Sequence, residues 1–313
     1  MSEDKITKVE DLPGIGPASL EKLTAAGKTD LMSIAVCSVA ELAELTGMTE
    51  AKVRLVIQTA RDSVDVGIVT AFDDKTKRQK NSFKIPTNSK TLDKLLNGGF
   101  ESSMISEVFA ENGAGKSQIA HQLCVNIQVM NPEWKAIYVD TENSFQPERI
   151  EQMAEAQDLD PEQVLKNIYK VHVFNTDHQM IIVEKNIQEL LQKDPSIKLL
   201  IIDSIINHFR HEFTGRGQLY DRQAKLGRHA SKIHELAHKH NLVVFITNQV
   251  MSDPAAMFVD PTKPAGGNIL GHISRLRLYL RKSSKGVTAK LRKSANLEDG
   301  EAIFQVTKEG VTD

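Results

Sequence analysis

The sequence predicts an α/β protein: a parallel sheet with helices on both faces, preceded by a small all-α domain. Three observations predict this fold. A glycine-rich loop at residues 110–117 lies between an apolar strand pattern and an apolar-periodic helix. From Pro86 onward, short β-branched runs alternate with amphipathic helical patterns, as in buried parallel sheets. Residues 1–66 carry only short helical patterns separated by Gly- and Pro-containing turns.

Composition sets limits on the class of protein. The chain has 313 residues, which is enough for two domains, and its apolar content of 40% is ordinary for a globular protein. A net charge of −2 means that any nucleic-acid surface must be local. Cys37 and Cys124 lie in apolar helical patterns and are expected to be reduced core residues. Without a signal-like start or a membrane-length apolar run, we expect a cytoplasmic, intracellular protein with no membrane contact.

The first 66 residues are expected to form a small domain that contains a helical hairpin. The segment Leu12-Pro-Gly-Ile-Gly-Pro17 would be the hairpin tip, and a weaker copy follows at residues 42–53. Glycines there let backbone N–H groups approach a nucleic-acid phosphate. The alternative is a compact helical module that binds only protein. A longer helix is expected from Glu50 to about Val66.

Residues 67–86 are expected to join the two domains. Within them, residues 72–85 are polar and charged with little periodicity, which is typical of a linker. Their basic run could contact nucleic acid, but a solvated linker accounts for the charge by itself. The larger domain would then span residues 87–313.

The larger domain begins as an alternation of strands and helices. Four buried parallel strands are expected, at Lys135–Val139, Val171–Phe174, Leu199–Ile202 and Leu242–Ile246. The last part of the chain shows strand patterns without helices between them, at Arg275–Lys282, Val287–Arg292 and Ala302–Thr307. These would extend the sheet with antiparallel strands.

The glycine-rich loop predicts a phosphate-binding site. Backbone N–H groups and the N-terminus of the following helix would hold phosphates. Lys116 would reach the β- and γ-phosphates, and the Ser117 hydroxyl would hold Mg²⁺. The pattern calls for glycine at the first loop position, where Ala110 stands, and alanine fits there if its φ is negative. A chance glycine-rich turn is the alternative. The expected nucleotide-binding residues are Asn112, Gly113, Ala114, Gly115, Lys116, Ser117 and Gln118.

Polar residues follow three of the strand patterns. Asp203 ends an apolar strand, and in a phosphate-loop fold such an acid holds the water shell of Mg²⁺. Glu142 is the candidate that orients and deprotonates an attacking water, while Asp140 could be a structural hydrogen-bonding group. Gln249 could sense a γ-phosphate without adding negative charge, or it could be a capping amide.

Two long segments flank these candidates, at residues 208–223 and 250–271. Both contain Gly or Pro and are expected to be loops, which at this length are usually functional or disordered. Arginines beside glycines suit contacts to a phosphate backbone, which carry no sequence information.

Many of these motifs, in this order, resemble the archaeal RadA recombinases of the RecA superfamily. The resemblance covers almost the whole chain. It includes Leu12–Pro17, Thr87–Asp93, Tyr138–Glu142, Pro147–Arg149, Asn175–Gln179, Thr214–Gly217, Arg222–Leu226, Thr247–Val250 and Gly266–His272. It implies a RecA-type ATPase core behind a helix-hairpin-helix domain. It also implies a nucleoid-associated protein of DNA recombination and repair that uses ATP to form a helical filament, or rings, on single-stranded DNA. This homo-oligomer would pair that strand with homologous double-stranded DNA.

The resemblance also implies roles for single residues. Lys116, Ser117 and Asp203 would serve the nucleotide and Mg²⁺, with Glu142 as the catalytic base. Arg149 would stack on adenine, Gln249 would read the γ-phosphate, and His272 would relay the nucleotide state to the second loop. DNA contacts are implied for Arg210, Arg216, Arg222 and Phe258.

The sequence departs from the family pattern at several places. The subunit-contact motif Phe-x-x-Ala is here Ile68-Val-Thr-Ala71, and Gln146 replaces the Arg of Phe-Arg-Pro-Glu-Arg. Lys293 stands where the family has an Asp that helps to hold a cation, often potassium, near the γ-phosphate of the neighbouring subunit. The Lys293 ammonium would supply that charge directly, as lysines do in bacterial RecA. The alternative is a surface strand end where charge varies freely.

These departures leave three functions to be compared. The first is a divergent recombinase, and the second is a regulatory paralogue that binds ATP and assists the main recombinase. The third is an ATP-dependent protein kinase or a clock-type ring, which would not need the N-terminal hairpin domain. DNA-stimulated ATPase activity separates the first from the third. Strand exchange without added recombinase separates the first from the second.

Overall fold

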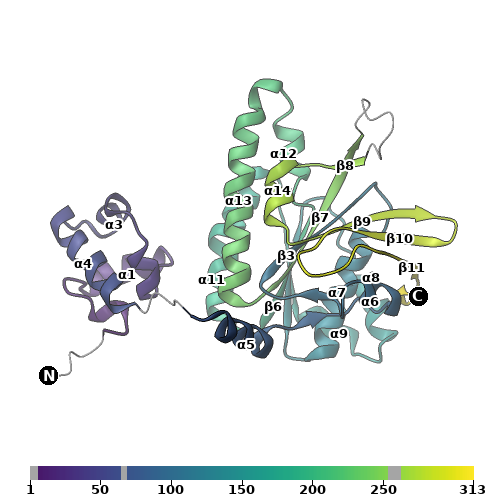
Figure 1. Ribbon diagram of the computed structural model, residues 1–313, viewed down its shortest axis with the longest axis horizontal. Helices are drawn as coiled ribbons and strands as arrows, with labels where there is room; N and C mark the ends of the chain where they lie inside the picture. Colours follow the sequence, from purple (N-terminus) through teal and green to yellow (C-terminus); the bar gives the residue numbers. More distant parts are fainter. Residues whose placement is uncertain (1–5, 65–68, 253–261) are drawn as a thin grey trace. The chain divides into compact units, whose positions relative to one another are not determined.

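The computed structural model describes residues 6–64, 69–252 and 262–313 (Figure 1). Contacts between residues divide the chain into two compact units between Lys80 and Asn81, inside the segment expected as a linker. In the described part of the chain no helix is long and apolar enough to cross a membrane.

The first unit is a bundle of short helices around one apolar core. Its elements are the 3-10 turn η1 (Val9–Asp11) and the helices α1 (Pro17–Ala25), α2 (Leu31–Ala35), α3 (Val39–Thr46) and α4 (Glu50–Ser63). Leu23, Leu42 and Val56 are fully buried in its core. Two hairpin tips join η1 to α1 and α3 to α4, so the first hairpin starts with a single 3-10 turn rather than an α-helix.

The segment expected as an irregular linker contains a helix, α5 (Ala71–Asn81), that the sequence analysis missed. None of its residues is buried, so no apolar periodicity marks it. Local interactions stabilise it instead. The Asp73 amide donates to the Thr70 hydroxyl at 3.1 Å, and Arg78 pairs with Asp74 one turn earlier at 2.9 Å.

The second unit is built on a ten-stranded mixed sheet. Its strands are β3 (Met104–Ala110), β4 (Lys135–Asp140), β5 (Ile168–His172), β6 (Ile197–Asp203), β7 (Val243–Ser252), β8 (Thr262–Pro264), β9 (Leu276–Ser283), β10 (Gly286–Lys293), β11 (Glu301–Thr307) and β12 (Gly310–Thr312). The spatial order is β12-β11-β10-β9-β3-β7-β6-β4-β5, with β8 on β7. Strands β3 to β7 and β9 pair in parallel, and β9 to β12 are antiparallel to one another, as expected for the extension. A separate two-stranded sheet pairs β1 (Lys84–Ile85) with β2 (Phe100–Glu101).

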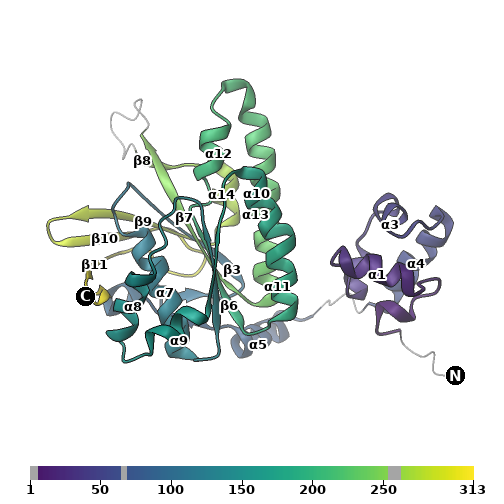
Figure 2. The ribbon, with the colours of Figure 1, turned by 180° about the vertical axis from the view of Figure 1, so that it is seen from behind.

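Helices cover both faces of the central sheet (Figures 1 and 2). One face carries α6 (Lys90–Leu95), α7 (Lys116–Met130), α8 (Pro147–Glu155) and α9 (Pro161–Lys166). The other carries α10 (Thr176–Ile181), the π-helical turn η2 (Ile182–Ile187), α11 (Gln188–Lys193), α12 (Asn207–Glu212), α13 (Leu219–His240) and α14 (Gly267–Ile273). Alternate residues of one strand enter different cores: Ile201 packs with the α7 side and Ile202 with the α13 side. Both faces are therefore apolar, which explains the continuous apolar runs in the sequence.

Three sequence expectations need correction. The strand expected at Val171–Phe174 lies earlier, at Ile168–His172, because Asn175 caps the next helix and ends strand pairing. The loop expected at 208–223 is mostly helical: it holds α12, the 3-10 turn η3 (Arg216–Gln218) and the first residues of α13. Phe209 is the only buried residue of α12, so the helix has no visible apolar period. The second segment begins as a continuation of β7, which ends at Ser252. After residues 253–261, which the structure does not describe, the segment forms β8 and the start of α14.

Candidate functional site

The glycine-rich loop connects β3 to α7. Gly113 and Gly115 have φ angles of 75° and 101°, in the left-handed region that glycine adopts without strain. Ala110 is the last residue of β3, where it pairs with Gln249 and Leu280 and keeps an extended backbone. Its methyl group is fully buried and causes no strain, so alanine fits the first position of the loop.

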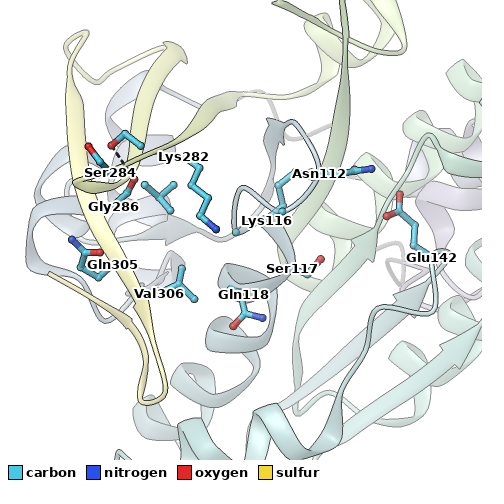
Figure 3. A pocket seen from close by; sticks show the side chains of 14 residues that line it. Asn112, Lys116, Ser117, Gln118, Glu142, Lys282, Ser284, Gly286, Gln305 and Val306 are labelled. Atoms are coloured by element: carbon cyan, nitrogen blue, oxygen red, sulfur yellow. Dashed lines mark hydrogen bonds between the residues drawn. The ribbon is translucent and has the colours of Figure 1, made fainter.

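The loop forms one wall of a pocket of about 580 Å³ (Figure 3). The expected residues Asn112, Gly113, Gly115, Lys116, Ser117, Gln118 and Glu142 line it, whereas Ala114 is buried behind the loop. The opposite wall comes from the β9–β10 hairpin and β11, and includes Lys282, Ser284, Gly286, Gln305 and Val306. The Lys282 side chain extends toward the loop in Figure 3. Nothing in the sequence singled out this second wall, because its polar residues sit in an ordinary hairpin pattern.

Lys116 is held against the loop by its own hydrogen bonds. Its ammonium donates to the carbonyl oxygens of Ala110 and Glu111 at 3.2 and 3.0 Å. Burial lowers the pKa of Lys116, and attraction to Asp203 and Glu142 acts in the opposite direction. A phosphate entering the pocket would meet a cation that already points at the loop.

Asp203 lies at the end of β6 and is almost completely buried. Its carboxylate accepts hydrogen bonds from the hydroxyls of Tyr138 at 2.7 Å, Ser144 at 2.9 Å and Thr247. Burial, followed by the charge of Asp203, raises the pKa of Tyr138 well above its ordinary value, so the phenol stays a donor. This ring of hydroxyl groups was not predicted from the sequence.

Glu142 and Asp140 follow β4 and have different surroundings. One Glu142 oxygen, Oε1, accepts from the Ser204 hydroxyl and from the Gln249 amide, both at 2.8 Å. Asp140 is fully buried and accepts from the backbone amides of Ser144 and Glu142 at 3.0 and 3.3 Å. Asp140 therefore shapes the turn that presents Glu142 to the pocket.

The oxygen-rich donor set suits Mg²⁺ in the presence of phosphate. The Ser117 hydroxyl and the Asp203 and Glu142 carboxylates are hard oxygen groups of the kind that Mg²⁺ prefers. Among the described residues, no three His, Cys, Asp or Glu side chains gather closely enough to hold a metal by themselves. A metal here would need phosphate oxygens and water to complete its coordination shell.

Arg149, in the first turn of α8, links the loop helix to the end of the chain. Its Nε donates to the Gln118 side chain at 2.7 Å, and its terminal nitrogens donate to the carbonyls of Thr307 and Lys308. Burial lowers the pKa of Arg149. These bonds fix the plane of the guanidinium next to Gln118, a pocket residue.

The side chains of two of the four residues implied in DNA contact are described. Arg210 lies on α12, where its Nη1 donates to Gln249 Oε1 at 2.7 Å. Arg222 lies on α13, and its Nε is buried without a hydrogen-bond partner among the described residues. Arg216 belongs to η3, and nothing is described of its side chain; Phe258 lies outside the described residues.

The residues expected at a subunit boundary are spread over three elements. Ile68 lies outside the described residues, while Ala71 begins the exposed helix α5. His272 lies in α14. Lys293 is engaged within its own chain: its ammonium donates to the carbonyls of Gly271, Ser274 and His272 at 2.7, 2.9 and 3.2 Å. It therefore caps the C-terminus of α14, and a free surface lysine is the wrong description of it.

Comparison with known proteins agrees with this architecture. Residues 77–313 match the Rad51 family, and residues 6–62 match the SAM-like helix-hairpin-helix tandem. The chain is 43% identical to the DNA repair and recombination protein RadA of Aeropyrum pernix, over 100% of this chain and 99% of that protein. Proteins with the same name from Methanococcus voltae and Methanococcus maripaludis are 42% and 41% identical, each over 97% of this chain and 98% of the relative. The chain therefore belongs to the Rad51 family of the RecA superfamily, among the archaeal RadA recombinases.

Proposed function

We propose that this protein acts in DNA recombination and repair as a DNA-dependent ATPase. It would assemble on single-stranded DNA and exchange that strand with a homologous duplex. The observation that carries the proposal is the pocket itself. The glycine-rich loop and the Glu142 carboxylate line it, and the Gln249 amide is bonded to that carboxylate, in a chain of the Rad51 family.

The nucleotide would be ATP, bound with its phosphates on the loop and its base near Arg149. Backbone N–H groups at the start of α7 and the Lys116 ammonium would hold the β- and γ-phosphates. Mg²⁺, held by Ser117 and through water by Asp203, would neutralise charge on the phosphate oxygens. The rigid guanidinium of Arg149 offers a flat cationic face on which adenine could stack.

Hydrolysis would use Glu142 as the general base. A water oxygen attacks the γ-phosphorus, the bond from that phosphorus to the bridging oxygen breaks, and the water proton passes to the Glu142 carboxylate. Ser204 and Gln249 both donate to Oε1 of Glu142, so the Ser204 bond would keep the carboxylate in place, with its second oxygen facing the water, after Gln249 turns away. Gln249 would turn its amide toward the γ-phosphate when ATP and DNA are both bound.

DNA would be bound through phosphate contacts, with little sequence preference. Gly14 has a φ of 91° at the first hairpin tip, and the space where its side chain would stand is open, as it is at Gly16 and Gly47. Backbone N–H groups at such tips can reach a phosphate. The segments around α12 and before α14 would supply the single-strand contacts. Binding should weaken steeply with salt because phosphate contacts release counterions.

The homo-oligomer would form through the segment that contains Ile68 and Ala71. Val69, inside that segment, and Phe72, directly after it, are 59% and 75% exposed, so apolar surface is available there for a neighbouring subunit. Ile68, Gln146 and Lys293 depart from the family pattern. These departures justify a test of one alternative function, namely a paralogue that assists the main recombinase.

Electron microscopy with ATP, Mg²⁺ and single-stranded DNA, combined with ATPase assays, tests the proposal. We expect filaments and DNA-stimulated turnover, both lost in Lys116→Ala. Filaments that persist in this variant would contradict the role given to the loop. An ATPase rate that single-stranded DNA does not change would indicate a kinase or clock-type ring. Strand exchange without any added recombinase distinguishes a recombinase from an assisting paralogue.

A further inference from the structure

A chain of side-chain contacts runs from helix α12 to the acid in the pocket. Arg210 Nη1 donates to Gln249 Oε1 at 2.7 Å, and Gln249 Nε2 donates to Glu142 Oε1 at 2.8 Å. The three residues come from α12, from β7 and from the turn after β4. Each bond has ordinary hydrogen-bond length, so the chain is continuous.

The chemistry of the two ends fixes the amide between them. A guanidinium can only donate hydrogen bonds, and an ionised carboxylate can only accept them. Gln249 must therefore turn its oxygen to Arg210 and an N–H to Glu142. Arg210 and Glu142 together fix which way the amide faces, although Arg210 does not line the nucleotide pocket.

We propose that Arg210 is a positioning residue that holds Gln249 on Glu142 until DNA binds. A DNA phosphate near α12 then withdraws the guanidinium and frees Gln249 to turn toward the γ-phosphate. The inference rests on the proposed function. Competition favours the phosphate, because a guanidinium and a phosphate are both charged and can form a bidentate pair, whereas the Gln249 oxygen is neutral and accepts one bond from Arg210. The Arg210 side chain can move without its helix, since the backbone amide stays bonded to the Ile206 carbonyl.

This arrangement predicts that ATP turnover rises when the hydrogen bond between Arg210 and Gln249 is removed. Without the guanidinium, the Gln249 oxygen loses its partner and only the bond to Glu142 still holds the amide, so the amide turns more readily even in the absence of DNA. ATP turnover without DNA should then rise toward the DNA-stimulated rate. The KM for ATP should change little, because Arg210 contacts neither the phosphate loop nor the opposite wall of the pocket.

The experiment measures DNA-free ATP turnover of the full chain in Arg210→Met, which keeps the apolar stem, and in Arg210→Ala. We expect kcat to rise about ten- to a hundredfold in both, which is the size of one hydrogen bond that involves a charged group. Arg228→Met is the matched control. Arg228 lies on α13 and pairs with Glu184 at 2.9 Å, away from the pocket, and its variant should match the parent.

A double-mutant cycle shows whether Arg210 acts through Gln249. In a Gln249→Ala background, Arg210→Met should have no further effect on DNA-free turnover. Two results would overturn the inference: unchanged or lower turnover in both Arg210 variants, or an equal increase in the Gln249→Ala background. A parent protein that hydrolyses ATP equally with and without DNA would overturn the proposed function, and this inference with it.

Discussion

Replacing Lys293 by Met should destabilise the second unit far more than a surface lysine substitution would. The ammonium donates to three carbonyl oxygens at the end of α14, all within 3.2 Å. A hydrogen bond involving a charged group contributes about 1.5–3 kcal/mol, and a cation at a helix C-terminus about 0.3–1 kcal/mol. One half-exposed ammonium shares the three bonds, so we expect a total loss of about 2–4 kcal/mol.

Thermal unfolding measures this loss. For a unit of this size, about 2–4 kcal/mol corresponds to a Tm lower by about 5–10 °C. Lys290→Met is the matched control, because Lys290 lies on the same strand and pairs with Glu301 in an exposed contact, which contributes little to stability. Hydrogen exchange across α14 should rise only in the Lys293 variant. Equal Tm values for the two variants would show that the three bonds contribute nothing.

The variant Lys293→Asp tests whether the same ammonium affects how ATPase activity depends on potassium. The substitution places a carboxylate beside three carbonyl oxygens, and a bound cation would then be needed to offset the repulsion. We expect the parent's DNA-stimulated ATPase to depend little on potassium, compared with sodium at constant ionic strength. Lys293→Asp should lose activity in sodium and regain part of it in potassium. A parent already activated strongly by potassium would contradict this role for the ammonium.

Four further predictions concern the pocket, the assembly and the core. Glu142→Gln should lower kcat by about 10²–10⁴ and leave ATP affinity nearly unchanged; near-normal turnover would assign the base elsewhere. Lys282→Ala should weaken ADP binding about three- to tenfold in calorimetry, and Lys285→Ala, in the same hairpin but outside the pocket, should not. Ile68→Phe should shift light scattering toward larger oligomers, since Phe buries more apolar area; a shift to smaller species would mean a pocket shaped for Ile. His229 is buried, and burial lowers its pKa to about 4. The contribution of the neutral ring to the free energy of unfolding is therefore complete above pH 6.5 and is lost as the pH falls to 4. On acidification to pH 5, His229→Gln should lose about 2 kcal/mol less unfolding free energy than the parent, and an unchanged pH profile would contradict that shift.

The strands of the parallel sheet could be predicted because both of their faces are buried. Ile201 and Ile202 enter opposite cores, so no polar residue interrupts the run. Helices α5 and α12 could not be predicted in the same way. The first buries no side chain and the second only Phe209, so the apolar period on which such a prediction depends is absent.

The candidate site likewise contains residues that could be predicted from the sequence and residues that could not. Residues at strand ends can be placed from sequence, because parallel register brings those ends to one edge: Ala110 pairs with Gln249, and Asp140 pairs with Asp203. The hydroxyls of Tyr138, Ser144 and Thr247 around Asp203 could not be foreseen, since any of them could equally have served as a core or turn residue. Lys282 was missed because hairpin sequences do not indicate which cavity they border.

Lys293 shows how much a residue's role depends on its neighbours in space. In the sequence it is a cation where the resembling family has an acid, which suggests a change at a subunit boundary. In the structure the same ammonium joins the end of β10 to the end of α14, which begins within the segment 250–271. A charge reversal at this position therefore alters the chain's own fold first. Any effect on a neighbouring subunit must act through the position of α14 and His272, which is why stability and potassium dependence have to be measured on the same variants.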